Sequence, residues 1–327
     1  MQGLFLSRGK RMRKEEFTFD SRDGVSKIYA CSWIPEEQPL CIFQIIHGMN
    51  DHVNRYEEFA SFLAQRGILV VGADMLGHGK TVPEGGIYGY FCENDPATVV
   101  VRDEHRLKKM IEEKYPTMPY ILFGHSMGSF IVRNYIARYG TGIKGVILGG
   151  TGTPTKTELK FGKFLVQIFT KLRGSASEVG LLHDISRNSY MNGIKDAKGK
   201  NDWLTTDEEQ IKRYEKDPFC VGFRFTVNGY RTLFDLAYRM QEEEILNKIP
   251  KKLPILIVSG TEDPVGSKGL APKQLYDTYL NLDFTKVTLK LYNGARHEVL
   301  FEKVKETAYE DLYSWIERVA MESQGGK

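Results

Sequence analysis

Short, almost continuously apolar runs alternate with amphipathic helical patterns along most of the chain after Glu15. Residues 40–46 form one such run and residues 68–73 another, and each is followed by a segment of helical periodicity. A continuous apolar run of this length is typical of a strand that is buried on both faces of a parallel sheet. The alternation therefore predicts repeated β-α-β units, which make an α/β fold with a mostly parallel central sheet and helices on both faces.

The ends of these elements are indicated by turn residues and by changes of period. The predicted strands are 16–18, 27–34, 40–46, 68–73, 120–123, 143–148, 253–258 and 286–291. The predicted helices are 55–65, 102–114, 127–139, 271–280 and 304–319. The first two strands flank the turn signal Ser21-Arg22-Asp23-Gly24, so they predict an opening hairpin.

The alternation stops between residues 151 and 250. That interval has helical patterns but no run typical of a buried strand. It therefore predicts a helical cap inserted into the α/β core after strand 6. The predicted domains are a basic N-terminal tail (1–14), a core in two parts (15–150 and 251–322) and the cap (151–250).

Composition narrows the functional class. The chain is 41% hydrophobic and 27% charged, which is typical of a globular protein with a large core and excludes a disordered, collagen-like or coiled-coil chain. The formal net charge of +3 is too small to indicate a nucleic-acid-binding protein. The four cysteines (Cys31, Cys41, Cys92 and Cys220) are widely spaced without a CxxC motif, so we expect neither a disulfide framework nor a zinc site.

Much of the excess positive charge lies near the N-terminus, at Arg8, Lys10, Arg11, Arg13 and Lys14. The short apolar run 4–6 precedes these charges, the reverse of a secretory signal, and no window approaches the ~20 apolar residues of a membrane span. We therefore predict a cytoplasmic protein with a solvated basic tail. The alternative for the tail is a surface for anionic lipid.

The sequence Gly124-His125-Ser126-Met127-Gly128 lies directly between a predicted strand and a predicted helix. At such a junction the glycines of GxSxG permit a tight bend that lifts the serine hydroxyl above the sheet edge. The helix N-terminus then directs free backbone N–H groups toward developing negative charge. The motif predicts Ser126 as a nucleophile; the alternative is an ordinary serine N-cap.

A serine nucleophile needs a base, and the base needs an orienting carboxylate. Asp263 and His297 follow the last two predicted strands, and catalytic groups of open α/β sheets gather beyond the carboxyl ends of the strands. Their order, Ser126, Asp263, His297, is that of an α/β-hydrolase triad. Glu262 and Glu298 are rival orienters of the histidine.

An oxyanion hole is predicted from the loop after strand 40–46, which reads His47-Gly48-Met49-Asn50. In this fold that loop donates one backbone N–H and the residue after the nucleophile donates the other. We assign these donors to Met49 and Met127, and interpret His47 and His78 as structural. The seven histidines show no metal-ligand spacing and no phosphate-binding glycine loop follows a strand, so we expect no metal and no cofactor.

With these motifs the chain resembles the monoacylglycerol lipase/lysophospholipase branch of the α/β-hydrolases, also described as the serine aminopeptidase S33 group. The matching segments are His47-Gly48 with His52 and Arg55-Tyr56, Asp74 with Gly77-His78-Gly79, residues 124–128, Gly260 with Asp263, and Tyr292-Gly294-Ala295-Arg296-His297-Glu298. The resemblance implies the α/β-hydrolase fold, Ser126 as nucleophile, His297 as base, Asp263 as orienter, and ester hydrolysis through an acyl-enzyme. The chain departs from the family at Asn50-Asp51, where Gly-Glu is common, and at Ser129, where a second glycine is common.

The resemblance also implies that residues 151–250 are a helical cap. One helical face there is apolar, with Phe161, Phe164, Leu165, Ile168, Phe169 and Leu172 at helical spacing. One interpretation is a helix packed on the domain; the other is that part of this face lines an acyl pocket or touches a lipid surface. The predicted substrate-binding residues are Phe161, Phe164, Leu165, Ile168 and Phe219.

The function predicted is that of a serine esterase acting on a small lipid ester, a monoacylglycerol or a lysophospholipid, with peripheral membrane contact through the cap. A short-chain carboxylesterase is one alternative. An aminopeptidase or amidase using the same triad is another, and it would hold a free amine with an acidic cluster such as 207–209 or 242–244. A ligand receptor without activity is the third, but no triad position is damaged.

Overall fold

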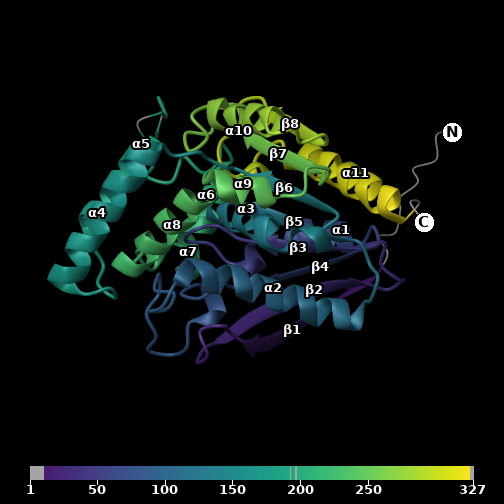
Figure 1. Ribbon diagram of the computed structural model, residues 1–327, viewed down its shortest axis with the longest axis horizontal. Helices are drawn as coiled ribbons and strands as arrows, with labels where there is room; N and C mark the ends of the chain where they lie inside the picture. Colours follow the sequence, from purple (N-terminus) through teal and green to yellow (C-terminus); the bar gives the residue numbers. More distant parts are fainter. Residues whose placement is uncertain (1–10, 192, 196, 325–327) are drawn as a thin grey trace.

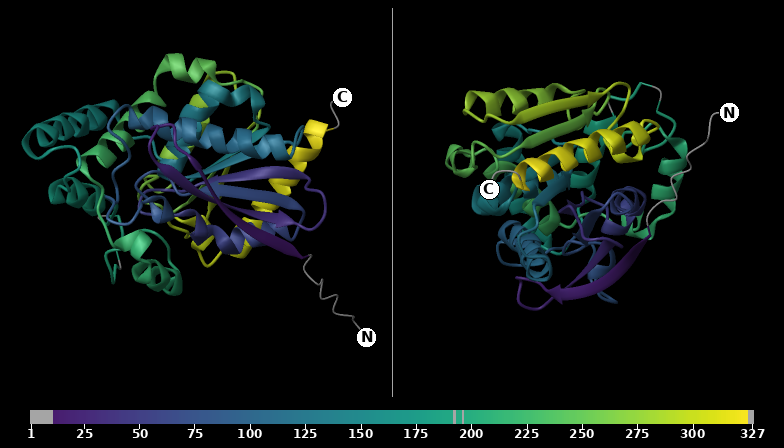
Figure 2. Two further views of the ribbon diagram at one scale, coloured as in Figure 1. Left: turned by 90° about the horizontal axis from the view of Figure 1, so that it is seen from below. Right: turned by 90° about the vertical axis from the view of Figure 1, so that its right-hand side faces the viewer.

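The computed structural model describes residues 11–191, 193–195 and 197–324, and it is organised around an eight-stranded sheet in the order β1-β2-β4-β3-β5-β6-β7-β8 (Figure 1). β1 pairs antiparallel with β2, and β2 antiparallel with β4, while all other neighbours are parallel. The strands are β1 (Met12–Asp20), β2 (Lys27–Pro35), β3 (Cys41–Ile46), β4 (Ile68–Ala73), β5 (Tyr120–His125), β6 (Gly145–Gly149), β7 (Ile255–Gly260) and β8 (Val287–Tyr292). The view from the side puts β1 at one edge of the sheet and β8 at the other (Figure 2, right).

The helices fall into a core set and a set between β6 and β7. The core helices are α1 (Glu57–Ala64), α2 (Pro96–Lys114), α3 (Met127–Tyr139), α10 (Leu270–Asn281) and α11 (Lys305–Gln324). The others are α4 (Lys156–Arg173), α5 (Gly180–Met191), α6 (Glu208–Lys216), α7 (Pro218–Val221), α8 (Val227–Arg239) and α9 (Glu243–Lys248). Short 3₁₀ turns are η1 (Val53–Tyr56), η2 (Gly79–Thr81), η3 (Gly140–Gly142) and η4 (Val299–Phe301).

The central strands are buried on both faces, and each face has its own apolar core. Because successive side chains of a strand point to opposite faces, Ile42 and Ile46 of β3 pack with residues of α2, α3 and α10. Phe43 and Ile45 pack with residues of α1 and α11 on the other face. The predicted fold class, a mostly parallel sheet with helices on both faces, is confirmed.

The N-terminal boundary needs a correction. β1 begins at Met12, so Arg13 and Lys14 belong to the sheet and not to a tail. The Lys14 ammonium donates a hydrogen bond to Asn54 (2.8 Å) and pairs with Glu57. β1 is a half-exposed edge strand, and its mixed polar sequence hid its first four residues from the apolar-run criterion. Residues 1–10 of the predicted tail, with Arg8 and Lys10, lie outside the described residues.

Residues 151–250, here called the helical insert, connect β6 to β7 and contain α4 to α9. Apart from the masked positions 192 and 196, the insert has no named strand, only an isolated bridge between Glu178 and Thr226. α4 is the outermost helix, at the left of Figure 1, whereas α8 packs on α2 and α3 of the core. In the described part of the chain, no helix has the length and apolar character that crossing a membrane requires.

Candidate active site

Ser126 lies in a strained turn between β5 and α3. Its φ of 51° and ψ of −117° are a conformation that non-glycine residues rarely adopt. The turn is tight because a Cβ at Gly124 would lie 2.4 Å from the Gly128 carbonyl oxygen, and one at Gly128 would lie 2.1 Å from that of Ile46. The spacing of the two glycines therefore has a direct steric cause, and the turn presents Ser126 at the end of the sheet.

Asp263 and His297 come together because the loops after β7 and β8 approach closely. A Cβ at Gly260 would lie 1.9 Å from the Ala295 carbonyl oxygen, so this contact requires glycine. Asp263 Oδ1 lies 3.0 Å from His297 Nδ1. Asp263 Oδ2 accepts a hydrogen bond from the Ser259 hydroxyl (2.9 Å). Both oxygens of the carboxylate thus have partners: the His297 imidazole on Oδ1 and the Ser259 hydroxyl on Oδ2.

The two rival carboxylates lie elsewhere. Glu262 pairs with Lys268 at the surface, and Glu298 pairs with Arg55. Burial alone would raise the pKa of Asp263, but the charge of His297, with hydrogen bonds from His297 and Ser259, holds that pKa below its usual value. Asp263 is therefore ionised at neutral pH, as an orienting carboxylate must be.

The structure brings Ser126 and His297 to the same small region around His125. A Cβ at Gly48 would lie 3.3 Å from Ser126 Cβ and 3.3 Å from His125 Cδ2. A Cβ at Gly150 would lie 2.9 Å from His297 Cε1 and 3.1 Å from His125 Cε1. His297 Nε2 is buried and has no hydrogen-bond partner among the described residues. That nitrogen is the one a nucleophilic hydroxyl would need.

The two predicted oxyanion donors flank this region. Met127 is the first residue of α3, so its N–H has no carbonyl partner within the helix. Met49 lies in the loop after β3, directly beyond Gly48, and that loop passes Ser126 at the distance given above. The two backbones thus approach the serine from different elements.

Three other buried histidines have structural surroundings. His47 Nδ1 lies 2.8 Å from the Gly48 carbonyl oxygen, and His47 Nε2 accepts a hydrogen bond from the Met75 N–H (3.0 Å). Burial lowers the pKa of His78 to about 3 and, with the nearby charge of His297, that of His125 to about 4. At neutral pH all three are uncharged, because burial also lowers the pKa of His47.

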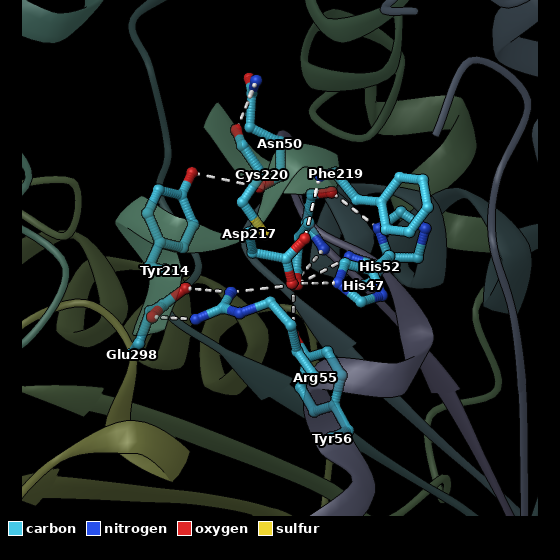
Figure 3. A network of polar contacts seen from close by, with 12 residues as sticks. His47, Asn50, His52, Arg55, Tyr56, Tyr214, Asp217, Phe219, Cys220 and Glu298 are labelled. Atoms are coloured by element: carbon cyan, nitrogen blue, oxygen red, sulfur yellow. Dashed lines mark hydrogen bonds and ion pairs between the residues drawn. The ribbon is translucent and has the colours of Figure 1, made fainter. Parts of the chain in front are cut away.

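A buried ionic network lies behind the predicted oxyanion loop (Figure 3). Arg55 donates two hydrogen bonds of 2.8 Å to the Glu298 carboxylate and one of 3.0 Å to Asp51. The guanidinium lies over the rings of Tyr214 (4.8 Å) and Phe301 (4.3 Å). Glu298 follows His297 in the chain, and Asp51 is two residues beyond Met49. Arg55 therefore ties the loop of the predicted base to the loop of the predicted oxyanion donor.

The charges of this network are mutually stabilised. Burial alone would raise the pKa of Asp51, but the charge of Arg55, together with the hydrogen bond from the Tyr56 hydroxyl, holds that pKa below its usual value. The Tyr56 hydroxyl donates to Asp51 at 2.7 Å. Residue-by-residue reading of the sequence missed this network, although Arg55-Tyr56 and Glu298 were among the matching segments.

The same loop contacts the helical insert. Asn50 Nδ2 donates hydrogen bonds of 3.2 Å to the carbonyl oxygens of Cys220 and Phe223, and the Asn50 carbonyl accepts one of 3.1 Å from the Tyr214 hydroxyl. His52 Nε2 lies 2.8 Å from Asp217 Oδ2. Asn50, where the chain departs from the family, thus joins the core to the insert.

One group of potential metal ligands occurs among the described residues: His52, Asp217 and Cys220, whose ligand atoms lie within 4.8 Å of one another. The contact between His52 and Asp217 already satisfies two of these groups. Burial raises the pKa of the Cys220 thiol, which opposes the thiolate form that binds metals. The donor set therefore favours a structural polar contact.

The predicted substrate-binding residues do not share one wall. α4 buries Leu159, Gly162 and Val166, with Gly162 against the ring of Phe234 on α8. Phe161 and Phe164 point the other way and are 59% and 56% exposed. The expected single apolar face is thus divided: Leu165 and Phe169 pack against an apolar cluster that includes buried residues of α4 and α8, Ile168 is half-buried and Leu172 is exposed.

Phe219 lies apart from α4. It contacts the His52 ring (centroids 5.4 Å apart) and lines an open cleft of about 690 Å³ between the insert and the β1 edge of the core. The cleft carries Lys14, Lys80, Arg213 and Lys216 beside two carboxylates. The acyl-lining role expected of Phe219 with the α4 residues is therefore not supported by their arrangement.

Comparison with known proteins gives one family. The sequence matches the family described as "Serine aminopeptidase, S33" over residues 37–304. A monoacylglycerol lipase from Mycolicibacterium smegmatis is 27% identical over 306 residues, which cover 93% of this chain and 97% of that protein. A monoglyceride lipase from Homo sapiens is 24% identical over 291 residues, covering 87% of this chain and 84% of that protein.

Solved structures agree with the fold. A thermostable carboxyl esterase from Bacillus coagulans, solved in complex with glycerol, superposes with a TM-score of 0.87 at 28% identity and covers 95% of this chain and 100% of that one. A soluble variant of monoglyceride lipase from Saccharomyces cerevisiae, solved with a substrate analog, has a TM-score of 0.73 at 21% identity and covers 96% of this chain and 98% of that one. The second likeness concerns the fold alone.

Proposed function

Because the chain belongs to the serine aminopeptidase S33 family of α/β-hydrolases, we propose that it cleaves carboxylic esters of lipids, monoacylglycerols or lysophospholipids, through an acyl-enzyme. The chain is an ester hydrolase of the α/β-hydrolase type, in line with its monoacylglycerol lipase relatives and its carboxyl esterase neighbour. The nature of the ester, the covalent intermediate and the residues in each role are the content of the proposal.

The observation that carries the proposal is the arrangement around His297. Its Nδ1 faces the buried Asp263 carboxylate at 3.0 Å, while its Nε2 is unpartnered among the described residues, in the region where Ser126 ends the strained turn. An imidazole held in this way keeps the proton on Nδ1 and offers Nε2 as a base. No other buried histidine described above has both features.

In the proposed mechanism, the Ser126 hydroxyl attacks the ester carbonyl while His297 Nε2 takes its proton. The C–O bond to the alcohol then breaks as His297 returns the proton to the leaving oxygen. Water repeats the cycle on the acyl-serine and releases the fatty acid. Asp263 stabilises the imidazolium that forms in both steps without itself taking the proton.

The backbone N–H groups of Met49 and Met127 are proposed to bind the carbonyl oxygen as it becomes negative. The N-terminus of α3 adds the favourable end of its dipole at the same place. Because the Met49 loop is fixed by Asp51 and Asn50, its amide is preorganised before the substrate arrives. Such fixed donors stabilise the transition state more than the ground state.

The substrate class predicts a dependence on acyl-chain length. We expect kcat/KM for 1-monoacylglycerols to rise from acetyl through octanoyl to a longer chain, by up to about fourfold for each methylene that becomes buried. The series is measured by released glycerol, and a parallel series of lysophospholipids separates the effect of the head group. Highest activity on the acetyl ester would contradict the lipid substrate and favour a short-chain carboxylesterase.

α4 is proposed to make the peripheral contact with lipid. Phe161, Phe164 and Leu172 are exposed on one side of it, and Lys160 and Lys171 lie on an adjacent side. An exposed apolar face beside basic residues suits an anionic lipid surface.

Replacing Phe161 and Phe164 with serine should lower the affinity for phosphatidylglycerol vesicles, measured by co-sedimentation, by about tenfold per residue. Val25→Ser, at an even more exposed apolar side chain in the β1–β2 turn, should leave vesicle binding unchanged; an equal loss there would contradict the assignment to α4.

The aminopeptidase alternative finds no comparable support. Asp207 caps α6, and Glu208 and Glu209 pair with Lys198 and Lys212. In the other acidic segment Glu242 pairs with Lys156, and Glu244 with Lys248. Hydrolysis of aminoacyl naphthylamides faster than of monoacylglycerols would nevertheless reverse this order of preference.

A further inference from the structure

The imidazole of His297 contacts an aromatic side chain that comes from the helical insert. The ring centroids of Trp203 and His297 lie 5.2 Å apart at an angle of 38°. Tyr190 of α5 lies against Trp203 in turn, at 4.9 Å. His125 contacts the same imidazole at 4.8 Å. The candidate base is therefore enclosed by a ring from the core and a ring from the insert, and it is only 1% exposed.

The segment around Trp203 is bound tightly to the loop that carries His297. The Glu298 N–H donates to the Leu204 carbonyl at 2.7 Å, directly beside both aromatic residues. Further hydrogen bonds between the two segments join Arg296 to the carbonyls of Asp202 (2.5 Å) and Thr205 (3.3 Å), Thr205 to the Phe301 carbonyl (3.0 Å), and Thr206 to the Glu302 carboxylate (2.9 and 2.5 Å). Residues 202–206, here called the Trp203 segment, are thus fixed with respect to His297.

We propose that Trp203 is a positioning residue for the base of the reaction proposed above. The Asp263 hydrogen bond holds only one nitrogen of the imidazole, so the ring could still tilt about that contact. Trp203 blocks this motion on its side and keeps water from the hydrogen bond between Asp263 and His297. Nε2 then stays in the orientation that accepts the Ser126 proton. Trp203 also packs on the small apolar cluster of Leu204, Tyr214 and Cys220. If that packing were its whole role, replacing its ring with another apolar side chain would leave the base unaffected.

Two substitutions separate these roles. Trp203→Leu keeps an apolar side chain and removes the ring, whereas Trp203→Phe keeps a ring. With a soluble p-nitrophenyl ester we expect Trp203→Leu to lower kcat by about 10- to 100-fold with KM changed less than threefold, as for a misplaced catalytic group. Trp203→Phe should recover most of that loss. Unchanged kcat in Trp203→Leu, or a loss confined to KM, would overturn the proposal.

A second measurement does not depend on activity or on a folded leucine variant. The chain has three tryptophans, and Trp33 and Trp315 are buried in the core. The difference in fluorescence between the wild type and Trp203→Phe isolates Trp203. Because an imidazole in ring contact quenches indole emission, that difference should be larger in the His297→Gln background than in the presence of His297. An equal difference in the two backgrounds would refute the ring contact.

The proposal and the proposed function fail in different ways. If a fluorophosphonate does not label the wild type, the serine hydrolase mechanism is wrong, whatever Trp203 does. If the wild type is labelled and Trp203→Leu is labelled at the same rate, only the positioning role of Trp203 is wrong. Slower labelling of folded Trp203→Leu, with the same unfolding temperature as Trp203→Phe, supports both.

Discussion

Replacing Ser126 with alanine is expected to lower kcat for ester hydrolysis by about 10⁴- to 10⁶-fold. The variant lacks the hydroxyl that would form the acyl-enzyme at the strained turn between β5 and α3. The remaining rate enhancement should come from the Met49 and Met127 amides and from substrate binding. Steady-state hydrolysis of a monoacylglycerol and of a p-nitrophenyl ester measures the loss of kcat and the rate that remains.

A matched control is available in the same turn of α3. Ser129 Oγ donates to the Ser126 carbonyl (2.6 Å) and lies 2.9 Å from the Thr151 hydroxyl oxygen, so it is a buried serine with no path to substrate. A fluorophosphonate probe should label the wild type and Ser129→Ala but not Ser126→Ala. Labelling of Ser126→Ala would show that another residue is the nucleophile.

Replacing Arg55 with methionine is expected to have the largest effect on stability, about 3–5 kcal/mol in the free energy of unfolding. The change leaves two buried carboxylates, Asp51 and Glu298, without their shared cation. An uncompensated buried charge costs far more than an ion pair contributes when both partners are present. Urea unfolding followed by circular dichroism gives the free energy, provided that the slope with urea is unchanged.

Arg66→Met is the control, because Arg66 has the same kinds of partner at the surface. It pairs with Glu310 at 2.9 Å and lies 3.6 Å over the Phe62 ring, but both charged groups are well exposed. Exposed pairs contribute up to about 1 kcal/mol, so this variant should be nearly as stable as the wild type. Equal losses for the two arginines would contradict the role of burial.

A double variant isolates the orphaned carboxylate. Arg55→Met combined with Glu298→Gln removes one of the two unpaired charges that Arg55→Met creates. It should therefore be more stable than Arg55→Met alone, so the two effects are not additive. A double variant that loses the sum of the two single losses would show that the network stabilises the fold through packing alone.

Several elements were predictable because their sequence pattern reports burial directly. Residues 68–73 were placed at the bounds of β4, since a strand covered on both faces appears in the sequence as an unbroken apolar run. Residues 127–139 were placed at the bounds of α3 by their helical pattern and by the glycine that follows them. The contact of Asp263 with His297 followed from a topological rule: residues after parallel strands gather at one edge of the sheet.

Other features depend on which partner an element meets in three dimensions. The spacing on α4 indicated one apolar face, but Gly162 lets α4 approach Phe234, so the buried side turned out to be centred between Leu159 and Val166. Likewise, nothing near Trp203 in the sequence indicates that it lies on His297, since 94 residues separate the two. Such contacts are set by loop packing, which has no periodic signature.

The position of α8 and α9 divides the helical insert into two parts with different roles in the chain topology. β6 and β7 are parallel neighbours, so the chain must return from one end of the sheet to the other between them. α8 and α9, packed on α3, make that return. Residues from α4 to α7 are not needed for this return of the chain between β6 and β7. A graft that exchanges this part of the insert between relatives should therefore begin after β6 and rejoin before Val227, leaving the crossover of the host protein intact.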